Sequence, residues 1–221
     1  MDMSPKARRS APADSRPSSA ERRSPHDALR TPHSARGRRA VFLDRDGVLN
    51  RDRDDFVRTP EEFELYPEAV RAAARLSRAG WAVVVASNQS GIARGYIRED
   101  ALAAMMDRLR SAVEDEGGKI DGIYHCPHGP KDSCPCRKPL PGLLRTAARE
   151  LGIDLSRSVM VGDSERDLAA GVAAGCRAAV LVLTGKVKPD DGPVWEAWAT
   201  SPDHVALTLH EAADWILRLE P

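Results

Sequence analysis

The chain has 221 residues, of which 42% are hydrophobic and 30% are charged, and its formal net charge is zero. This length suits one sizeable domain with a hydrophobic core, and the composition is that of a soluble globular protein. The sequence has no apolar signal-peptide core and no run of eighteen apolar residues, so it gives no indication of secretion or of a membrane span.

The first 39 residues differ in composition from the rest of the chain. They carry ten Lys and Arg residues against four acidic ones, a net charge of +6, and they are rich in Ser, Pro and Ala. Because they contain so few large apolar side chains, we expect residues 1–39 to form a disordered basic tail. Such a tail can contact nucleic acid or anionic lipid, and its composition also resembles an organellar transit peptide. The absence of aromatic residues and of an amphipathic period favours a simple solvated tail.

From residue 40 onward, short apolar runs alternate with amphipathic segments. Strands are predicted at 40–44, 81–87, 119–126, 157–163 and 178–185, and helices at 67–80, 97–118, 141–152, 164–175 and 209–219. This alternation predicts an α/β fold over residues 40–221, a Rossmann-like doubly wound parallel sheet with helices on both faces.

Informative polar residues stand at the ends of four predicted strands, where open parallel sheets carry their active sites. They are Asp44, Ser87, Cys126 and Asp163. Asp44 and Asp46 lie two positions apart in extended backbone, so both carboxylates can reach one point, and their repulsion calls for a cation or a shared proton. Asp163 adds a third carboxylate, and such oxygen ligands suit Mg²⁺. The alternative is that Asp163 or Ser164 caps the following helix.

The stretch CPHGPKDSCPCRKP holds a second motif. Its Cys126, His128, Cys134 and Cys136 follow the pattern C-x-H-x5-C-x-C. Three thiolates and one imidazole make the closed tetrahedral set typical of structural Zn²⁺. Disulfide bonding is the alternative, but a C-x-C pair strains a bridge and nothing indicates an oxidising compartment. Cys176 is left over and is expected to be a small buried residue.

The stretch DRDGVLN resembles the first signature of the haloacid dehalogenase superfamily of phosphohydrolases, and Ser87, Lys138 and Asp163 stand where its other signatures fall. The resemblance implies that Asp44 is the nucleophile that forms an aspartyl-phosphate and that Asp46 is the general acid and base. It also implies that the Asp44 carboxylate, the Asp46 main-chain carbonyl and Asp163 hold Mg²⁺. Ser87 and Lys138 would then contact the transferring phosphoryl group.

Within that superfamily, the zinc motif resembles two branches, the heptose bisphosphate phosphatases of bacterial heptose synthesis and the histidinol-phosphate phosphatase domains. The stretch SNQSGIARGY favours the heptose branch. That resemblance implies a substrate-binding set of Asp52, Ser87, Asn88, Gln89, Ser90, Arg137 and Lys138. Arg137 is expected at the distal phosphate, with a surface salt bridge as the alternative. Asp167 is placed to orient Lys138 or the water ligands of the metal. Ser164 departs from the lysine that well-known members carry after Gly-Asp, which puts phosphate binding there in doubt.

The resemblance implies a Mg²⁺-dependent phosphatase that removes the 7-phosphate of D-glycero-D-manno-heptose 1,7-bisphosphate. Only about forty residues separate Asp44 from Ser87, so no large cap domain is expected between them. A histidinol-phosphate phosphatase is the alternative within the same class. A zinc-containing nucleic-acid-binding protein is the alternative from another class, and the acidic charge of residues 40–221 disfavours it. We expect a cytoplasmic monomer whose partner is a small sugar bisphosphate, with no nucleic acid and no membrane.

Overall fold

The computed structural model describes Met1 and residues 37–219. Most of the tail that the sequence predicts therefore lies outside the described residues. Residues 37–39, which the sequence assigns to that tail, contact the folded unit. Arg38 forms a parallel bridge with Ile153, and its guanidinium donates to an Asp121 carboxylate oxygen at 2.9 Å.

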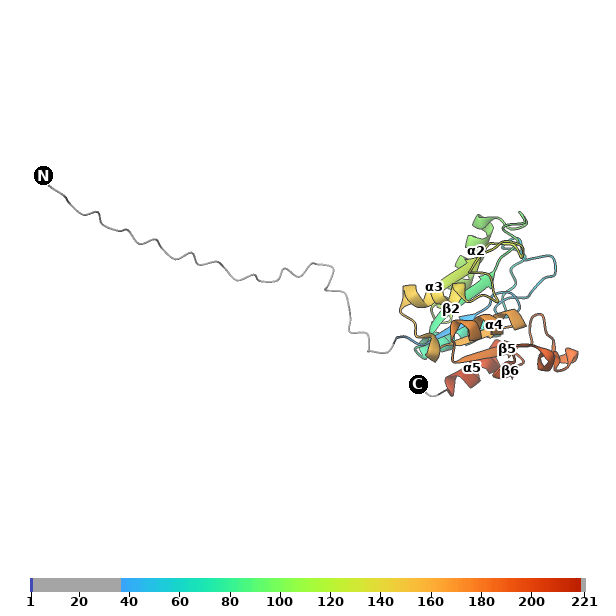
Figure 1. The fold of residues 1–221 in the computed structure, drawn as a ribbon. Helices are drawn as coiled ribbons and strands as arrows, with labels where there is room; N and C mark the ends of the chain where they lie inside the picture. Colours follow the sequence, from blue (N-terminus) through green and yellow to red (C-terminus); the bar gives the residue numbers. More distant parts are fainter. Residues whose placement is uncertain (2–36, 220–221) are drawn as a thin grey trace. The chain divides into compact units, whose positions relative to one another are not determined.

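A six-stranded parallel sheet, in the order β3-β2-β1-β4-β5-β6, forms the centre of this unit (Figure 1). The strands are β1 (Ala40–Leu43), β2 (Ala82–Asn88), β3 (Gly122–Cys126), β4 (Val159–Gly162), β5 (Ala178–Val182) and β6 (His204–Ala206). The strand order reverses at β1, which pairs with β2 on one side and with β4 on the other. The predicted doubly wound sheet is thus confirmed, and its switch point falls at the strand that ends just before Asp44.

Five helices cover the two faces of the sheet. They are α1 (Pro67–Arg78), α2 (Glu99–Asp115), α3 (Gly142–Leu151), α4 (Glu165–Ala174) and α5 (Leu209–Leu217). Alternate residues of β1 enter different cores: Val41 and Leu43 pack with α1, α2 and α5, whereas Phe42 packs with α3. Helix α4 packs on the outer strands through Leu168. This alternation is the period of two that an extended strand imposes on its side chains.

Strand β6 was not predicted from the sequence. It has only three residues and lies at the edge of the sheet, where it pairs with β5 alone. Such a short run carries too few alternations to be recognised. Three 3₁₀ helices, η2 (Leu155–Arg157), η3 (Pro189–Asp191) and η4 (Val194–Ala197), also lie in segments that were expected to be loops.

Because all six strands are parallel, the loops that follow them leave the sheet from the carboxyl ends of the strands, on the right-hand side of Figure 1. Residues 37–219 belong to one compact unit and contain no separate cap domain. Within residues 37–219, no helix is both long enough and apolar enough to cross a bilayer.

Candidate active site and metal cluster

The predicted nucleophile Asp44 follows β1 directly and contacts a buried lysine. Lys138 Nζ lies 2.9 Å from Asp44 Oδ1 and 2.6 Å from Asp167 Oδ1, and it also donates to the carbonyl of Ala86 at 2.7 Å. Lys138 and Asp167 are each about 2% exposed. The expected contact between Asp167 and Lys138 is therefore confirmed, and the lysine is fixed from three directions.

Three carboxylates meet at this point. Oxygen atoms of Asp44, Asp163 and Asp167 lie within 4.8 Å of one another. Burial raises the pKa of Asp44 to about 6; Lys138 opposes this shift, while Asp167 and Asp46 add to it. Burial, with Asp167 and Asp44, also raises the pKa of Asp163 well above its usual value. One lysine among three carboxylates leaves an excess of negative charge, which a divalent cation would offset.

Two glycines make room for Asp163. A Cβ at Gly47 would lie 2.4 Å from Asp163 Oδ2, and a Cβ at Gly185 would lie 1.9 Å from the same atom. Gly47 also has a φ of +82°, a conformation that side chains disfavour. Asp163 in turn accepts a hydrogen bond from the Lys186 amide at 2.6 Å. The loops after β1 and β5 therefore close around one carboxylate oxygen.

The predicted acid and base, Asp46, faces a different set of partners. The Arg45 guanidinium donates to both of its oxygens, at 2.7 and 2.8 Å, and Asn50 and Gln89 each donate one hydrogen bond at 2.9 Å. Burial works to raise the pKa of Asp46, but the charge and hydrogen bonds of Arg45, then Asn50 and Gln89, outweigh it and lower that pKa. Arg45 itself is 1% exposed. These donors thus favour the ionised form of Asp46, and its carboxylate lies beside the cluster rather than within it.

The end of β2 supplies the next predicted residues. Ser87 Oγ accepts a hydrogen bond from Gln89 Nε2 at 2.8 Å. Asn88 is bonded to the backbone of Lys138 in both directions: its Nδ2 donates to the Lys138 carbonyl, and its Oδ1 accepts from the Lys138 amide, both at 3.0 Å. Asn88 therefore ties the end of β2 to the loop that carries Lys138.

Asp52, the predicted sugar contact, is engaged in an ion pair. Lys186 Nζ lies 2.5 Å from Asp52 Oδ2. The hydrogen bond and charge of Asp52 raise the pKa of Lys186. The ion pair joins the loop after β1 to the loop after β5, and Lys186 was not identified from the sequence.

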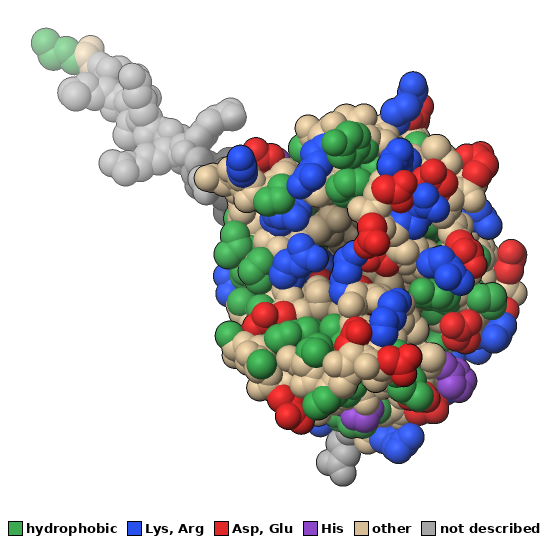
Figure 2. All heavy atoms as spheres, turned by 90° about the vertical axis from the view of Figure 1, so that its right-hand side faces the viewer, with side chains coloured by type: hydrophobic (Ala, Val, Ile, Leu, Met, Phe, Trp, Pro, Cys, Tyr) green, Lys and Arg blue, Asp and Glu red, His purple; other side chains and the backbone are tan. Residues whose placement is uncertain are grey.

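Most of these residues line a single cavity of about 240 Å³. It contains each predicted catalytic, magnesium and substrate residue: Asp44, Asp46, Asp52, Ser87, Asn88, Gln89, Ser90, Arg137, Lys138 and Asp163. Phe56, Val57 and Ile97 add an apolar wall. On the face of the molecule where the strands end, Lys and Arg side chains are interspersed with Asp and Glu around a hollow (Figure 2).

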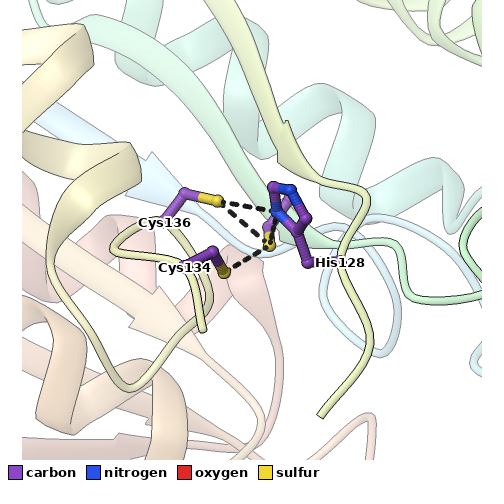
Figure 3. A group of neighbouring side chains, drawn as sticks. His128, Cys134 and Cys136 are labelled. Atoms are coloured by element: carbon purple, nitrogen blue, oxygen red, sulfur yellow. Dashed lines mark hydrogen bonds between the residues drawn. The ribbon is translucent and has the colours of Figure 1, made fainter. Parts of the chain in front are cut away.

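The predicted zinc ligands also come together, and Figure 3 shows the side chains of His128, Cys134 and Cys136 pointing toward one another. Cys136 Sγ lies 3.2 Å from Cys126 Sγ and 3.4 Å from His128 Nδ1, and Cys134 Sγ lies 3.7 Å from Cys126 Sγ. Ligand atoms about 2.3 Å from a tetrahedral Zn²⁺ would lie roughly 3.8 Å apart, so the geometry fits such an ion. The four cysteines form no disulfide. Burial, then the contact with Cys136, raises the pKa of the Cys126 thiol to about 12, so a bound cation is what would make it a thiolate.

A family model described as haloacid dehalogenase-like hydrolase matches residues 8–171 of the chain. The chain belongs to the haloacid dehalogenase-like hydrolases. A second model, described as HAD-hydrolase-like, matches residues 135–212.

Similar members of this superfamily carry a specific activity in their names. The chain is 52% identical to the D-glycero-beta-D-manno-heptose-1,7-bisphosphate 7-phosphatase of Pseudomonas aeruginosa over 149 residues, which is 67% of this chain and 83% of that one. It is 50% identical to the phosphatase of the same name from Bordetella bronchiseptica over 145 residues, 66% of this chain and 80% of that one. The crystal structure of the D,D-heptose 1,7-bisphosphate phosphatase of B. bronchiseptica, complexed with magnesium and phosphate, superposes with a TM-score of 0.75 at 43% identity. The match covers 81% of this chain and 98% of that chain.

Several residues of this superfamily site were not identified from the sequence. Arg45, Lys186 and Arg166 all line the cavity. Arg45 had a signal, since it stands between the two aspartates of DRDG, but nothing in the sequence showed that its guanidinium turns onto Asp46. Ser164 donates a hydrogen bond to Asp167 at 2.6 Å.

Proposed function

We propose that the chain hydrolyses the 7-phosphate of D-glycero-D-manno-heptose 1,7-bisphosphate. The observation that carries the proposal is the contact of Asp44 with Lys138 beside Asp163, in a chain about half identical to phosphatases of that name. The names of these relatives specify the beta anomer, and the beta bisphosphate is the substrate to test first.

The reaction uses Asp44 and Asp46 in two steps. A carboxylate oxygen of Asp44 attacks phosphorus while the bond from phosphorus to the sugar oxygen breaks, and Asp46 gives a proton to that oxygen. In the second step Asp46 takes a proton from water, whose oxygen attacks phosphorus and releases inorganic phosphate from Asp44. The ionised form of Asp46, which Arg45 favours, is the form that the second step needs.

The residues around Asp44 stabilise the charge on the transferring phosphoryl group. Lys138 places its positive charge beside the phosphoryl oxygens, and Ser87 donates a hydrogen bond from the end of β2. A magnesium ion fits the oxygen ligands of Asp44 and Asp163 together with the Asp46 main-chain carbonyl, and when bound it supplies positive charge to the phosphoryl oxygens. Asp52, Asn88, Gln89 and Ser90 would contact the sugar, and Arg137 the phosphate that stays on it.

The cluster of Cys126, His128, Cys134 and Cys136 suits a structural zinc ion, because four protein ligands leave no open position for chemistry. Zinc there would order the loop that leads into Lys138. We further propose that the enzyme acts as a cytoplasmic monomer.

The test of the function compares two substrates on the purified protein. We expect a kcat/KM at least about tenfold higher for the heptose bisphosphate than for histidinol phosphate, with Mg²⁺ present in both assays. The opposite preference would assign the chain to the histidinol-phosphate branch. Phosphate release from both anomers, measured in parallel, decides the anomer.

A further inference from the structure

Six Lys and Arg side chains line the active-site cavity, and most of them are already neutralised. They are Arg45, Arg53, Arg137, Lys138, Arg166 and Lys186. Four of the six pair with carboxylates: Arg45 with Asp46, Arg53 with Asp55, Lys138 with Asp44 and Asp167, and Lys186 with Asp52. Within residues 37–219, Arg137 and Arg166 are the cavity cations without a carboxylate partner.

The two arginines differ in how they are held. Arg137 Nη1 donates to the main-chain carbonyl of His128 at 3.1 Å, which orients its guanidinium and leaves its other donors available. The side chain of Arg166 is exposed and forms no hydrogen bond or ion pair with any other described residue. Its guanidinium is therefore free to bind an anion.

The chain places the two arginines on either side of the catalytic ion pair. Arg137 directly precedes Lys138, and Arg166 directly precedes Asp167 in the first turn of α4; Lys138 and Asp167 are 2.6 Å apart. Both arginines also line a second hollow, of about 330 Å³, beside the metal-ligand loop at Pro130 and Leu140. They therefore lie at the boundary between the catalytic cavity and the adjoining hollow.

We propose that Arg166, together with Arg137, binds the phosphate that remains on the sugar during the reaction. A phosphate monoester carries close to two negative charges, which two guanidinium groups can neutralise through bidentate hydrogen bonds. The reacting phosphate is provided for elsewhere, at Asp44, Ser87 and Lys138. This inference rests on the proposed function, because it requires a substrate with a second phosphate, and it makes Arg166 a specificity-determining residue.

The test uses two inhibitors that separate the two phosphate positions. Heptose 1-phosphate carries only the retained phosphate, whereas inorganic phosphate occupies the reacting position. With p-nitrophenyl phosphate as the reporter substrate, we expect Arg166→Gln to raise the inhibition constant of heptose 1-phosphate about tenfold and that of inorganic phosphate less than about twofold. The KM for the bisphosphate should rise in parallel with the first constant while kcat changes little, and Arg166→Lys should restore part of the affinity.

Arg71→Gln is the matched control, since Arg71 is an exposed helical arginine outside the cavity. Equal shifts in both inhibition constants would overturn the proposal, as would no shift in either. If wild-type protein prefers histidinol phosphate over the heptose bisphosphate, the proposed function fails and the role of Arg166 falls with it. If wild-type protein prefers the bisphosphate and Arg166→Gln binds heptose 1-phosphate normally, only the role of Arg166 fails.

Discussion

Lys138 and Asp167 form an ion pair of 2.6 Å in which each residue is about 2% exposed. A buried pair of this kind stabilises the fold little in itself, but removing one partner leaves an uncompensated buried charge. Lys138 also reaches Asp44, so the same pair links the stability of the fold to the chemistry of the nucleophile.

The ion pair gives a prediction that separates structure from chemistry. Lys138→Met should lower the free energy of unfolding by about 3–5 kcal/mol, because it leaves the buried charge of Asp167 unpaired. Asp167→Asn should lower it less, because Asp44 remains as a partner of Lys138. The double variant should recover part of that stability and none of the activity, because the phosphoryl group still lacks its lysine. Urea denaturation and phosphate release measure the two effects. Additive losses of stability in the double variant would contradict the coupling.

Asp44→Asn should lower kcat by roughly a thousandfold or more, because an amide cannot form the aspartyl-phosphate. The melting temperature should not fall, since burial already disfavours the charged form of Asp44 and raises its pKa to about 6. Zinc content should also match that of wild type. Activity near the wild-type level would refute the assignment of the nucleophile.

Gly185→Ala should weaken magnesium binding. The new Cβ would lie 1.9 Å from Asp163 Oδ2, so the carboxylate has to move from its present position. We expect the Mg²⁺ concentration for half-maximal activity to rise about tenfold, with activity partly restored at high Mg²⁺. Gly129→Ala is the control, because its Cβ would have 3.4 Å to the nearest atom. An unchanged Mg²⁺ dependence in Gly185→Ala would exclude Asp163 as a tightly placed ligand.

Cys134→Ser should lose the zinc ion and lower the melting temperature by about 5–10 °C, because metal binding is coupled to folding. Cys176→Ser, which lies outside the cluster, should keep the zinc. Elemental analysis and thermal unfolding with and without a chelator measure both properties. If Cys134→Ser lost its zinc and kept its melting temperature, the structural role of the metal would be wrong.

Asp121 should contribute stability that depends on pH. Burial opposes its ionisation, but hydrogen bonds from Arg38 and Lys119 outweigh this and lower the pKa of Asp121 below its usual 3.8. A carboxylate with a lowered pKa stabilises the folded state above its unfolded pKa, and this contribution is lost as the pH falls through the folded pKa. Asp121→Asn should therefore cost about 2 kcal/mol at pH 7 and less at pH 3, by urea denaturation. A constant difference between the two pH values would contradict this.

The main elements and the positions of the site residues at the strand ends could be predicted from the sequence because both depend on local pattern. The alternation of apolar runs and turns in the sequence locates the ends of β1, β2, β3 and β4. In a parallel sheet the carboxyl ends of these strands lie close together. Asp44, Ser87, Cys126 and Asp163 follow from that rule. The C-x-H-x5-C-x-C spacing also identifies the candidate metal ligands, because residues so close in sequence can come together through local backbone conformation alone.

The contacts between loops could not be predicted in this way. The ion pair of Asp52 with Lys186 and the orientation of Arg45 toward Asp46 depend on how the loops after β1, β2 and β5 fold over one another. The hydrophobic periodicity of the sequence carries no information about how these loops pack against one another. Arg166 was not predicted for a related reason. An arginine in the first turn of a helix is usually a solvated surface residue, and only the structure shows that this one lines a cavity.

Cys136 and Lys138 are separated by a single residue, and Asn88 holds the Lys138 backbone from the other side. A metal ion bound by the cluster would fix Cys136, and the hydrogen bonds of Asn88 fix Lys138. The backbone of residues 136–138 would then have little conformational freedom. The conformational entropy of Lys138 is therefore lost when the chain folds, and not when substrate binds. Substrate then meets a cation that is already in position, and more of its binding energy is available to stabilise the transition state.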